Sequence, residues 1–120
     1  MKKILIVEDH ADIRRLIRMT LEFDDYEITE ASDGESGLAQ ALAERPDLVL
    51  LDVMMPGKLD GLDVCKALKA YPNSPRVLLL TARGRSEDLD VGLQAGADAY
   101  LVKPFSPLQL IETINAQWEL

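Results

Sequence analysis

The sequence predicts an α/β fold with a doubly wound parallel sheet, and two observations lead to this fold class. Short apolar runs alternate five times with segments in which apolar residues recur at helical spacing. The runs at 48–51 and 77–80 contain no polar residue, as expected of strands buried on both faces of a parallel sheet. Strict alternation of strands and helices implies right-handed crossovers with helices on both faces. With 120 residues and no linker or low-complexity segment, the whole chain, 1–120, is expected to form one domain.

The first segments are an apolar strand, an amphipathic helix and an edge strand. The strand at 4–7 is followed at once by Glu8 and Asp9. From Ala11, apolar residues recur at helical spacing, which predicts a helix that ends near 24–25. Residues 26–31 alternate between polar and apolar side chains, which suits an edge strand with one solvated side.

A second helix and a buried strand come next. Ser32 and Glu35 have the spacing of a capping box, which predicts a helix start that leads to a stop at Pro46. The run at 48–51 then ends in Asp52, before a turn at 56–57. An aspartate at the carboxyl end of such a strand lies where open α/β sheets bind their ligands. From this stretch alone, Asp52 could equally cap a loop or a following helix.

The second half repeats the pattern. Apolar residues at 62–68 predict a helix, and the strand at 77–80 ends at Thr81 and Ala82. Residues 86–88 (Ser-Glu-Asp) predict the start of a helix that stops at Gly96. A strand at 100–102 ends in Lys103, and Ser106 followed by Pro107 predicts the start of a final helix.

Composition excludes several classes of protein. The net charge of -8 argues against direct binding of nucleic acid, because phosphate backbones attract clustered Lys and Arg. No apolar run approaches the roughly 18 residues of a membrane span, and the run at 4–7 is too short for a signal peptide. The chain has one cysteine and one histidine, so an internal disulfide and a zinc-type ligand set are both excluded. We expect a cytoplasmic protein that does not bind membranes.

The polar residues at the strand ends are expected to form one cluster. The carboxyl ends of parallel strands meet at one edge of the sheet, so Glu8, Asp9, Asp52, Thr81 and Lys103 should converge there. Three crowded carboxylates resist ionisation unless a cation lies among them, and Mg²⁺ is the hard, oxygen-seeking ion that fits. A lysine and a hydroxyl suit phosphoryl oxygens. The cluster therefore indicates phosphoryl transfer to a carboxylate.

Four motifs resemble those of the receiver domains of two-component response regulators: VEDH, LLDVMMPG, LLLTA and YLVKPF, in that order along the chain. The resemblance implies a flavodoxin-like fold with sheet order 2-1-3-4-5. It implies Asp52 as the phosphoacceptor. Asp9, Asp52 and the Met54 carbonyl would hold Mg²⁺, with Glu8 assisting through water and Mn²⁺ able to substitute.

By the same resemblance, Lys103 and the backbone of Met54 and Ala82 contact the phosphoryl group. Thr81 moves toward that group after transfer, and Tyr100 turns inward as the aromatic switch. The Lys103–Pro104 bond is expected to be cis.

The partners implied are a sensor histidine kinase or a phosphotransfer protein. An output domain or a downstream protein would bind the face formed by the helix at 86–96, the strand at 100–102 and the final helix. Two departures from the family stand out. The turn after Asp52 is one residue longer than the commonest form, and residues 105–120 carry no Lys or Arg. Symmetric dimerisation through salt bridges of that face is therefore not expected.

Three classes of function compete. The leading one is a phosphorylation-activated switch that is not itself an enzyme. A phosphohydrolase of the haloacid dehalogenase type also uses an aspartyl nucleophile, but needs an acid two residues later, where Met54 stands. A receiver-like module that is never phosphorylated is the third, although such domains usually lose an acid, the Thr or the Lys.

Other residues have simple interpretations. His10 is interpreted as a loop residue at the entry to the first helix, and Cys65 as a small apolar residue. Arg14, Arg15 and Arg18 are interpreted as a solvated helix face. The resemblance implies, as a hypothesis, that this end of the helix also docks the phosphodonor, with Phe105 nearby.

Overall fold

The structure is a computed structural model that describes residues 1–55, 57–82 and 91–119. Strands and helices alternate along the chain as predicted. Their bounds are β1 (Lys2–Val7), α1 (Ala11–Leu21), β2 (Tyr26–Ala31), α2 (Gly34–Glu44), β3 (Leu48–Asp52), α3 (Gly61–Lys69), β4 (Arg76–Thr81), β5 (Ala99–Val102) and α5 (Pro107–Trp118). Residues 91–94 are helical as well. The helix start predicted at 86–88 lies outside the described residues.

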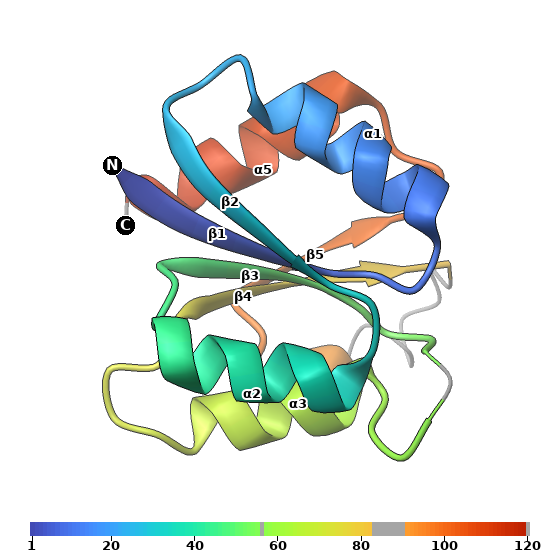
Figure 1. Cartoon of the computed structure of the whole chain (residues 1–120), viewed down its shortest axis with the longest axis vertical. Helices are drawn as coiled ribbons and strands as arrows, with labels where there is room; N and C mark the ends of the chain where they lie inside the picture. The colour runs from blue at the N-terminus through green and yellow to red at the C-terminus, as the bar shows by residue number, and fades with distance from the viewer. Residues whose placement is uncertain (56, 83–90, 120) are drawn as a thin grey trace.

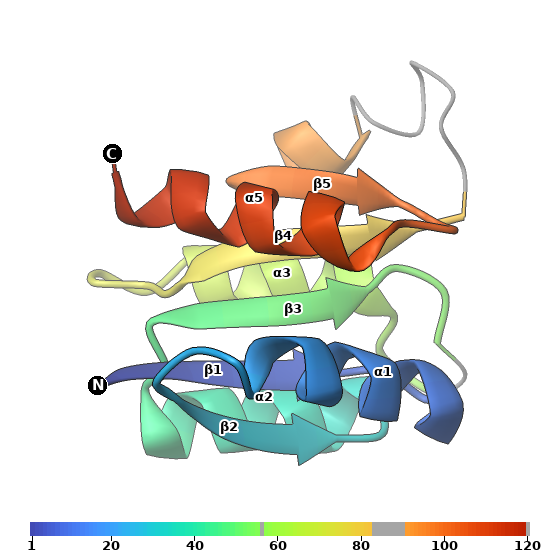
Figure 2. The same cartoon turned by 90° about the horizontal axis from the view of Figure 1, so that it is seen from above.

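The five strands form one parallel sheet in the order β2-β1-β3-β4-β5, which confirms the predicted fold class and strand order. The sheet is the middle of three layers, with α1 and α5 on one face and α2 and α3 on the other (Figure 1). Figure 2 shows α1 and α5 lying side by side over the strands. β2 is an edge strand, as its alternating sequence predicted.

Two apolar clusters hold the layers together, one on each face of the sheet. Alternate residues of the central strands point to opposite faces, so that Leu50 belongs to one cluster and Leu51 to the other. Every residue of β3 is buried, which explains why its sequence is a continuous apolar run up to Asp52. Cys65 is fully buried in the cluster under α2 and α3, which confirms its interpretation as a packing residue.

The start of α2 differs from the prediction. Asp33, not Ser32, is the N-cap: its backbone is extended and its carboxylate accepts a 2.8 Å hydrogen bond from the Ser36 N–H. Glu35 does not close a capping box, because its side chain accepts a 2.9 Å hydrogen bond from the Leu59 N–H instead. The Ser-x-x-Glu spacing therefore placed the helix start one residue too early.

The ends of the other helices agree better with the predictions. Ser106 caps α5 with Pro107 at the first helical position, as predicted, and Gln109 completes a capping box. Gly96 has a φ of +95°, the conformation expected of a glycine that stops a helix. The Lys103–Pro104 bond is cis. α1 ends at Leu21 rather than near 24–25, because the Asp24 N–H turns back to the Leu21 carbonyl. Among the described residues, no helix is long and apolar enough to cross a membrane.

Candidate functional site

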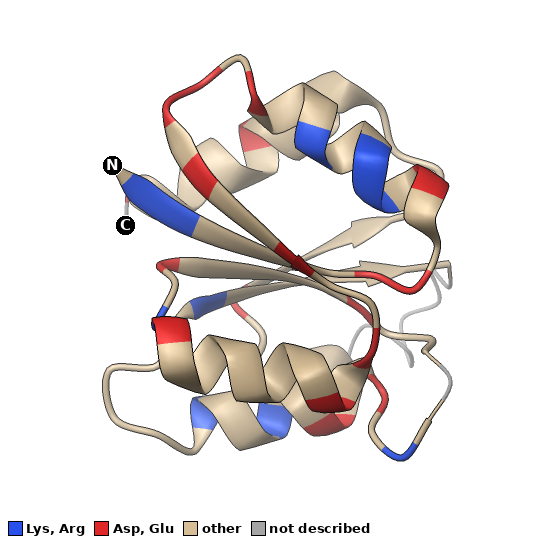
Figure 3. Cartoon of the chain, in the orientation of Figure 1, with Lys and Arg blue, Asp and Glu red and all other residues tan. Residues whose placement is uncertain are grey.

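The structure brings the predicted polar residues to one edge of the sheet. Glu8 and Asp9 follow β1, Asp52 and Thr81 end β3 and β4, and Lys103 follows β5. In register, Asp52 lies opposite Leu80 of β4, so the strand ends are level with one another. Figure 3 shows acidic residues where β1 and β3 end. The convergence predicted from the strand order is confirmed.

Lys103 is the cation at the centre of this edge. Its Nζ lies 2.7 Å from Glu8 Oε1 and 3.2 Å from Asp52 Oδ1. Glu8 and Asp52 are almost completely buried, with 0% and 2% of their surface exposed. One ammonium group therefore faces two buried carboxylates. When both carboxylates are ionised, the three groups together carry one uncompensated negative charge.

The pKa values of these groups reflect that imbalance. Burial and the neighbouring Glu8 carboxylate raise the pKa of Asp52 to about 7, although Lys103 acts in the opposite direction. Burial opposes the ionisation of Glu8, but its hydrogen bonds with Asp52 and Lys103 hold its pKa below the usual value. Burial also acts against the charge on Lys103, but the two carboxylates raise its pKa above the usual value. At neutral pH this site can therefore hold a proton on Asp52 or accept a further cation.

The oxygen atoms around Asp9 fit a divalent cation. Asp9 Oδ1 is buried and accepts no hydrogen bond from the described residues. Ligand atoms of Glu8, Asp9, His10 and Asp52 all lie within 4.8 Å of one another. Mg²⁺ prefers oxygen ligands such as carboxylates, and a set of carboxylate oxygens binds it in preference to soft metal ions. The cluster thus has the composition for a magnesium site.

Hydrogen bonds hold the loop after Asp52 in place at both ends. Gly61 begins α3 so close to Asp52 that a side chain there would overlap the Asp52 carbonyl oxygen, and its N–H donates to the Val53 carbonyl. At the far end of the longer turn, Glu35 binds the Leu59 N–H. Asp60 caps α3 with a reciprocal bond to Asp63, so Asp52 does not cap this helix. This result removes the alternative that Asp52 caps the following helix.

Met54 and Ala82 lie in the loops at this edge. The Met54 N–H lies 3.4 Å from Asp52 Oδ1, whereas its side chain is exposed. Ala82 directly follows Thr81 and is exposed. The Met54 backbone therefore lies in a position compatible with its predicted contact to an oxyanion on Asp52.

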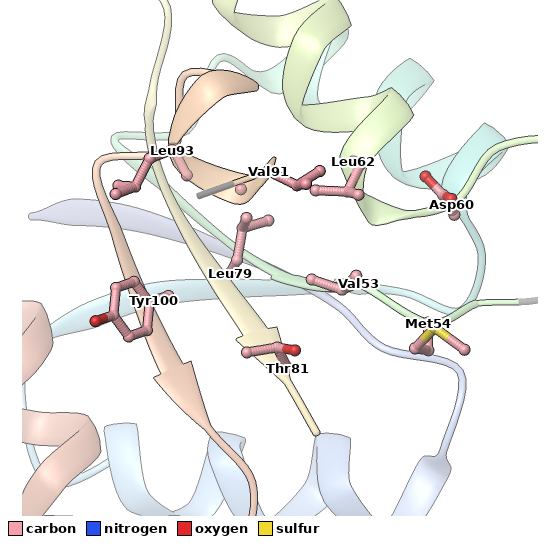
Figure 4. Close-up of a pocket in the computed structure, with 11 residues that line it drawn as sticks. Val53, Met54, Asp60, Leu62, Leu79, Thr81, Val91, Leu93 and Tyr100 are labelled. Atoms are coloured by element: carbon pink, nitrogen blue, oxygen red, sulfur yellow. The ribbon is translucent and has the colours of Figure 1, made fainter. Parts of the chain in front are cut away.

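Thr81 and Tyr100 line one cavity of about 250 Å³ (Figure 4). Its other walls include Val53, Met54, Leu79 and Leu93. Tyr100 lies opposite Leu79 in register, on the strand beside that of Thr81, and 41% of its surface is exposed. The cavity thus connects the edge that carries Asp52 with the outer surface of β5.

Two arginines of α1 form hydrogen bonds and ion pairs with other elements, which was not predicted. Arg14 donates to the Glu8 carbonyl oxygen at 2.6 Å and to Glu30 of β2 at 3.0 Å, and Arg18 binds the other Glu30 oxygen at 2.7 Å. The prediction of a simply solvated face was wrong for Arg14 and Arg18, and it fits only Arg15, which is exposed. The missed partner, Glu30, is 16 residues from Arg14 and becomes a neighbour only through the pairing of β2 with β1. Phe105 is half-buried against the cluster under α1 and α5.

Comparisons with known proteins agree on one family. The model of the response regulator receiver domain matches residues 4–115. The transcriptional regulatory protein ResD of Bacillus subtilis is 45% identical over 114 residues, which is 95% of this chain and 47% of that protein. The probable transcriptional regulator ycf27 of Cyanophora paradoxa is 49% identical over 115 residues, or 96% of this chain and 47% of that protein. The chain thus spans about half the length of these curated relatives.

Solved structures show the same fold. The chemotaxis protein CheY4 of Vibrio cholerae superposes with a TM-score of 0.90 at 35% identity, covering 97% of this chain and 98% of that one. The receiver domain of the Francisella response regulator 1452 has a TM-score of 0.91 at 32% identity, covering 99% of this chain and 98% of that one. Both the sheet order and the flavodoxin-like architecture are shared.

Proposed function

The chain belongs to the response regulator receiver domains, and from this premise we propose that it accepts a phosphoryl group on Asp52 in the presence of Mg²⁺. The observation that carries the proposal is the position of Asp52. Its carboxylate ends a buried strand beside Lys103 and the unsatisfied oxygen of Asp9. The donor would be a sensor histidine kinase or a phosphotransfer protein.

Asp9, Asp52 and the Met54 carbonyl would hold the Mg²⁺, with Glu8 acting through water. A divalent cation there supplies positive charge that favours ionised Asp52 and neutralises charge on the phosphoryl oxygens. The ionised Asp52 oxygen attacks phosphorus, the bond between phosphorus and the donor nitrogen breaks, and the electron pair leaves with the donor. The product is an acyl phosphate, with Lys103 and the Met54 and Ala82 backbone available to its oxygens.

We propose that Thr81 and Tyr100 change position when Asp52 carries a phosphoryl group, and that this movement alters the outer surface of the domain. They share a cavity whose volume of about 250 Å³ leaves room for a side chain to move inward. An inward position of Tyr100 would shift a pre-existing equilibrium between two states of the domain.

The proposed output surface consists of the helical residues 91–94, β5 and α5. It carries exposed apolar side chains on all three elements: Val91, Leu93, Tyr100, Val102 and Leu108. Three of them, Val91, Leu93 and Tyr100, line the same cavity, and grouped exposed apolar side chains mark protein interaction sites. The curated relatives are named as transcriptional regulators, so we propose that an output domain or a downstream protein that binds here controls transcription.

The proposal concerns a signalling switch rather than a hydrolase. Met54 occupies the position where the haloacid dehalogenase chemistry requires an acid, and its side chain is exposed. The cytoplasm is the proposed compartment, in keeping with a single cysteine that leaves the chain without an internal disulfide.

The test is the intact mass after incubation with acetyl phosphate, with and without Mg²⁺. We expect the mass of one phosphoryl group to be added to the native protein only with Mg²⁺, and not to Asp52→Asn. Asp24→Asn, which removes an exposed acid in the turn before β2, is the matched control and should be modified like the native protein. Absence of modification under every condition would instead favour a receiver-like module that acts without phosphorylation.

A further inference from the structure

The side chain of His10 takes no part in starting α1, although His10 is the N-cap of that helix. The N-caps of α2, α3 and α5 are Asp33, Asp60 and Ser106, and each accepts a backbone hydrogen bond through its side chain. His10 makes no such bond. Its imidazole is 66% exposed, so it is accessible from solvent.

The imidazole instead faces the acidic pair. His10 Nδ1 lies 3.3 Å from Asp9 Oδ1 and 3.7 Å from Glu8 Oε2. Asp9 Oδ1 is the buried oxygen that accepts no hydrogen bond from the described residues, so it is available to a ligand. A carboxylate oxygen and an imidazole nitrogen, both of which can bind a metal ion, therefore lie side by side.

This separation suits two ligands of one metal ion. Ligands about 2.1 Å from a metal lie about 3.0 Å apart in an octahedral shell and about 3.4 Å apart in a tetrahedral one. The observed 3.3 Å between Nδ1 and Oδ1 lies within that range. Asp52 supplies a further carboxylate to the same cluster, in which all ligand atoms lie within 4.8 Å of one another.

We propose that His10 Nδ1 is a direct ligand in the proposed cation site, on which this inference rests, so that the site also takes a transition ion such as Zn²⁺, Co²⁺ or Ni²⁺. The set excluded from the sequence was one of several Cys or His side chains, whereas this one combines a single histidine with carboxylates. Imidazole nitrogen binds these ions well, whereas Mg²⁺ takes oxygen ligands and keeps several waters. The same site thus binds Mg²⁺ through its oxygens and a transition ion through His10 and Asp9 together. Phosphoryl transfer to Asp52 becomes sensitive to which of the two ions is present.

The sequence makes the test direct, because His10 is its single histidine. The full chain without an affinity tag is labelled with ¹⁵N, and its imidazole resonances are followed as Zn²⁺ or Mg²⁺ is added. We expect Zn²⁺ to shift the Nδ1 resonance and Mg²⁺ to leave it in place. In calorimetry, His10→Gln should weaken Zn²⁺ binding by about tenfold or more and Mg²⁺ binding by less than about twofold.

Two control variants separate this inference from the proposed function. Asp12→Asn removes an acid from the first turn of α1 outside the cluster and should leave both affinities unchanged. Asp9→Asn should weaken both ions. If Zn²⁺ binds in an Asp9-dependent way with Nδ1 unmoved, or binds His10→Gln as tightly as the native protein, the role of His10 is wrong and the magnesium site stands. If neither ion binds, or Asp9→Asn changes neither affinity, the cation site fails and the inference fails with it.

Discussion

The ammonium group of Lys103 lies 2.7 Å from a carboxylate oxygen of Glu8, although 95 residues separate them in sequence. The contact joins the ends of β1 and β5, which are not neighbours in the sheet. It also leaves Lys103 within 3.2 Å of Asp52, so one cation stabilises two buried acids. Replacing Lys103 should therefore lower the stability of the fold as well as affect phosphoryl transfer.

We expect Lys103→Met to lower the free energy of unfolding by about 2 to 4 kcal/mol at pH 8, because it leaves two buried carboxylates without their ion pair. The raised pKa of Lys103 means that its contribution is fully present at this pH and is lost only when the lysine deprotonates. Urea denaturation measures the change, and Mg²⁺ should restore part of it. Lys66→Met, at an exposed lysine of α3, is the control and should change stability little. Equal stability of the two variants would show that the Lys103 pair is weak.

Stability should also depend on the ionisation of Asp52. Its pKa of about 7 lies above the ordinary 3.8, so between these values the folded protein binds more protons than the unfolded chain. Stability from this group therefore falls as the pH rises from about 4 to about 7. We expect Asp52→Asn to be more stable than the native protein at pH 8, by about 1 to 4 kcal/mol.

The measurement is urea denaturation of both proteins at pH 5 and pH 8 without divalent ions. The difference between them should be much larger at pH 8, and Mg²⁺ should reduce it by favouring ionised Asp52. A difference that is independent of pH would mean that Asp52 titrates near its ordinary value.

Gly61→Ala should destabilise the fold and disturb Asp52 together. The added Cβ would overlap the Asp52 carbonyl oxygen and lie 2.7 Å from Val53 Cα, and both are backbone atoms of the chain that positions the acceptor. We expect a loss of about 1 to 3 kcal/mol or more in chemical denaturation, and slower modification by acetyl phosphate. Gly92→Ala is the matched control, since among the described residues its Cβ would meet the end of the Leu79 side chain and no backbone atom. The argument fails if the two alanine variants lose the same stability.

Asp98 connects α3 with the starts of β4 and β5. It accepts hydrogen bonds from the Val77 N–H at 2.8 Å and from Arg76 at 3.3 Å, and it pairs with Lys69 at 2.6 Å. Burial opposes its ionisation, but Lys69 and the Val77 N–H hold the pKa of Asp98 below its ordinary 3.8. The stability that this group contributes is therefore present above pH 3.8 and is lost as the pH falls through the lower pKa of the folded protein.

Asp98→Asn should accordingly lower the free energy of unfolding by about 1 to 3 kcal/mol at pH 7. The difference from the native protein should shrink below about pH 3.8, because the Asp98 carboxylate of the unfolded chain takes up a proton at higher pH than that of the folded protein. Denaturant titrations at pH 7 and pH 3 measure both effects, with Asp24→Asn as a control acid outside this network. A difference that stays constant down to pH 3 would contradict the role of ionised Asp98.

The sequence predicted those features that depend on periodicity and strand order. The continuous apolar run before Asp52 shows a strand buried on both faces, and parallel pairing then brings the strand ends together. Contacts between helices and distant parts of the chain were not predictable, because they depend on how the helices lie on the sheet. Glu30 reaches Arg14 only after β2 pairs with β1, and Glu35 reaches Leu59 only because α2 lies beside the longer turn. The cap at Asp33 was missed for a local reason, since Ser32 and Asp33 both have capping side chains and only the backbone angles decide between them.

The charged side chains on β2 have a consequence for the behaviour of the protein in concentrated solution. An edge strand offers unpaired backbone groups to which another molecule can add a strand, and this is a common route to aggregation. On β2, the exposed Glu27 places a charge where a second copy would have to pair, and Arg18 lies 3.5 Å from the Ile28 carbonyl oxygen. The opposite edge is β5, which has four residues and is followed closely by Pro104. Both edges of the sheet therefore discourage growth into fibrils.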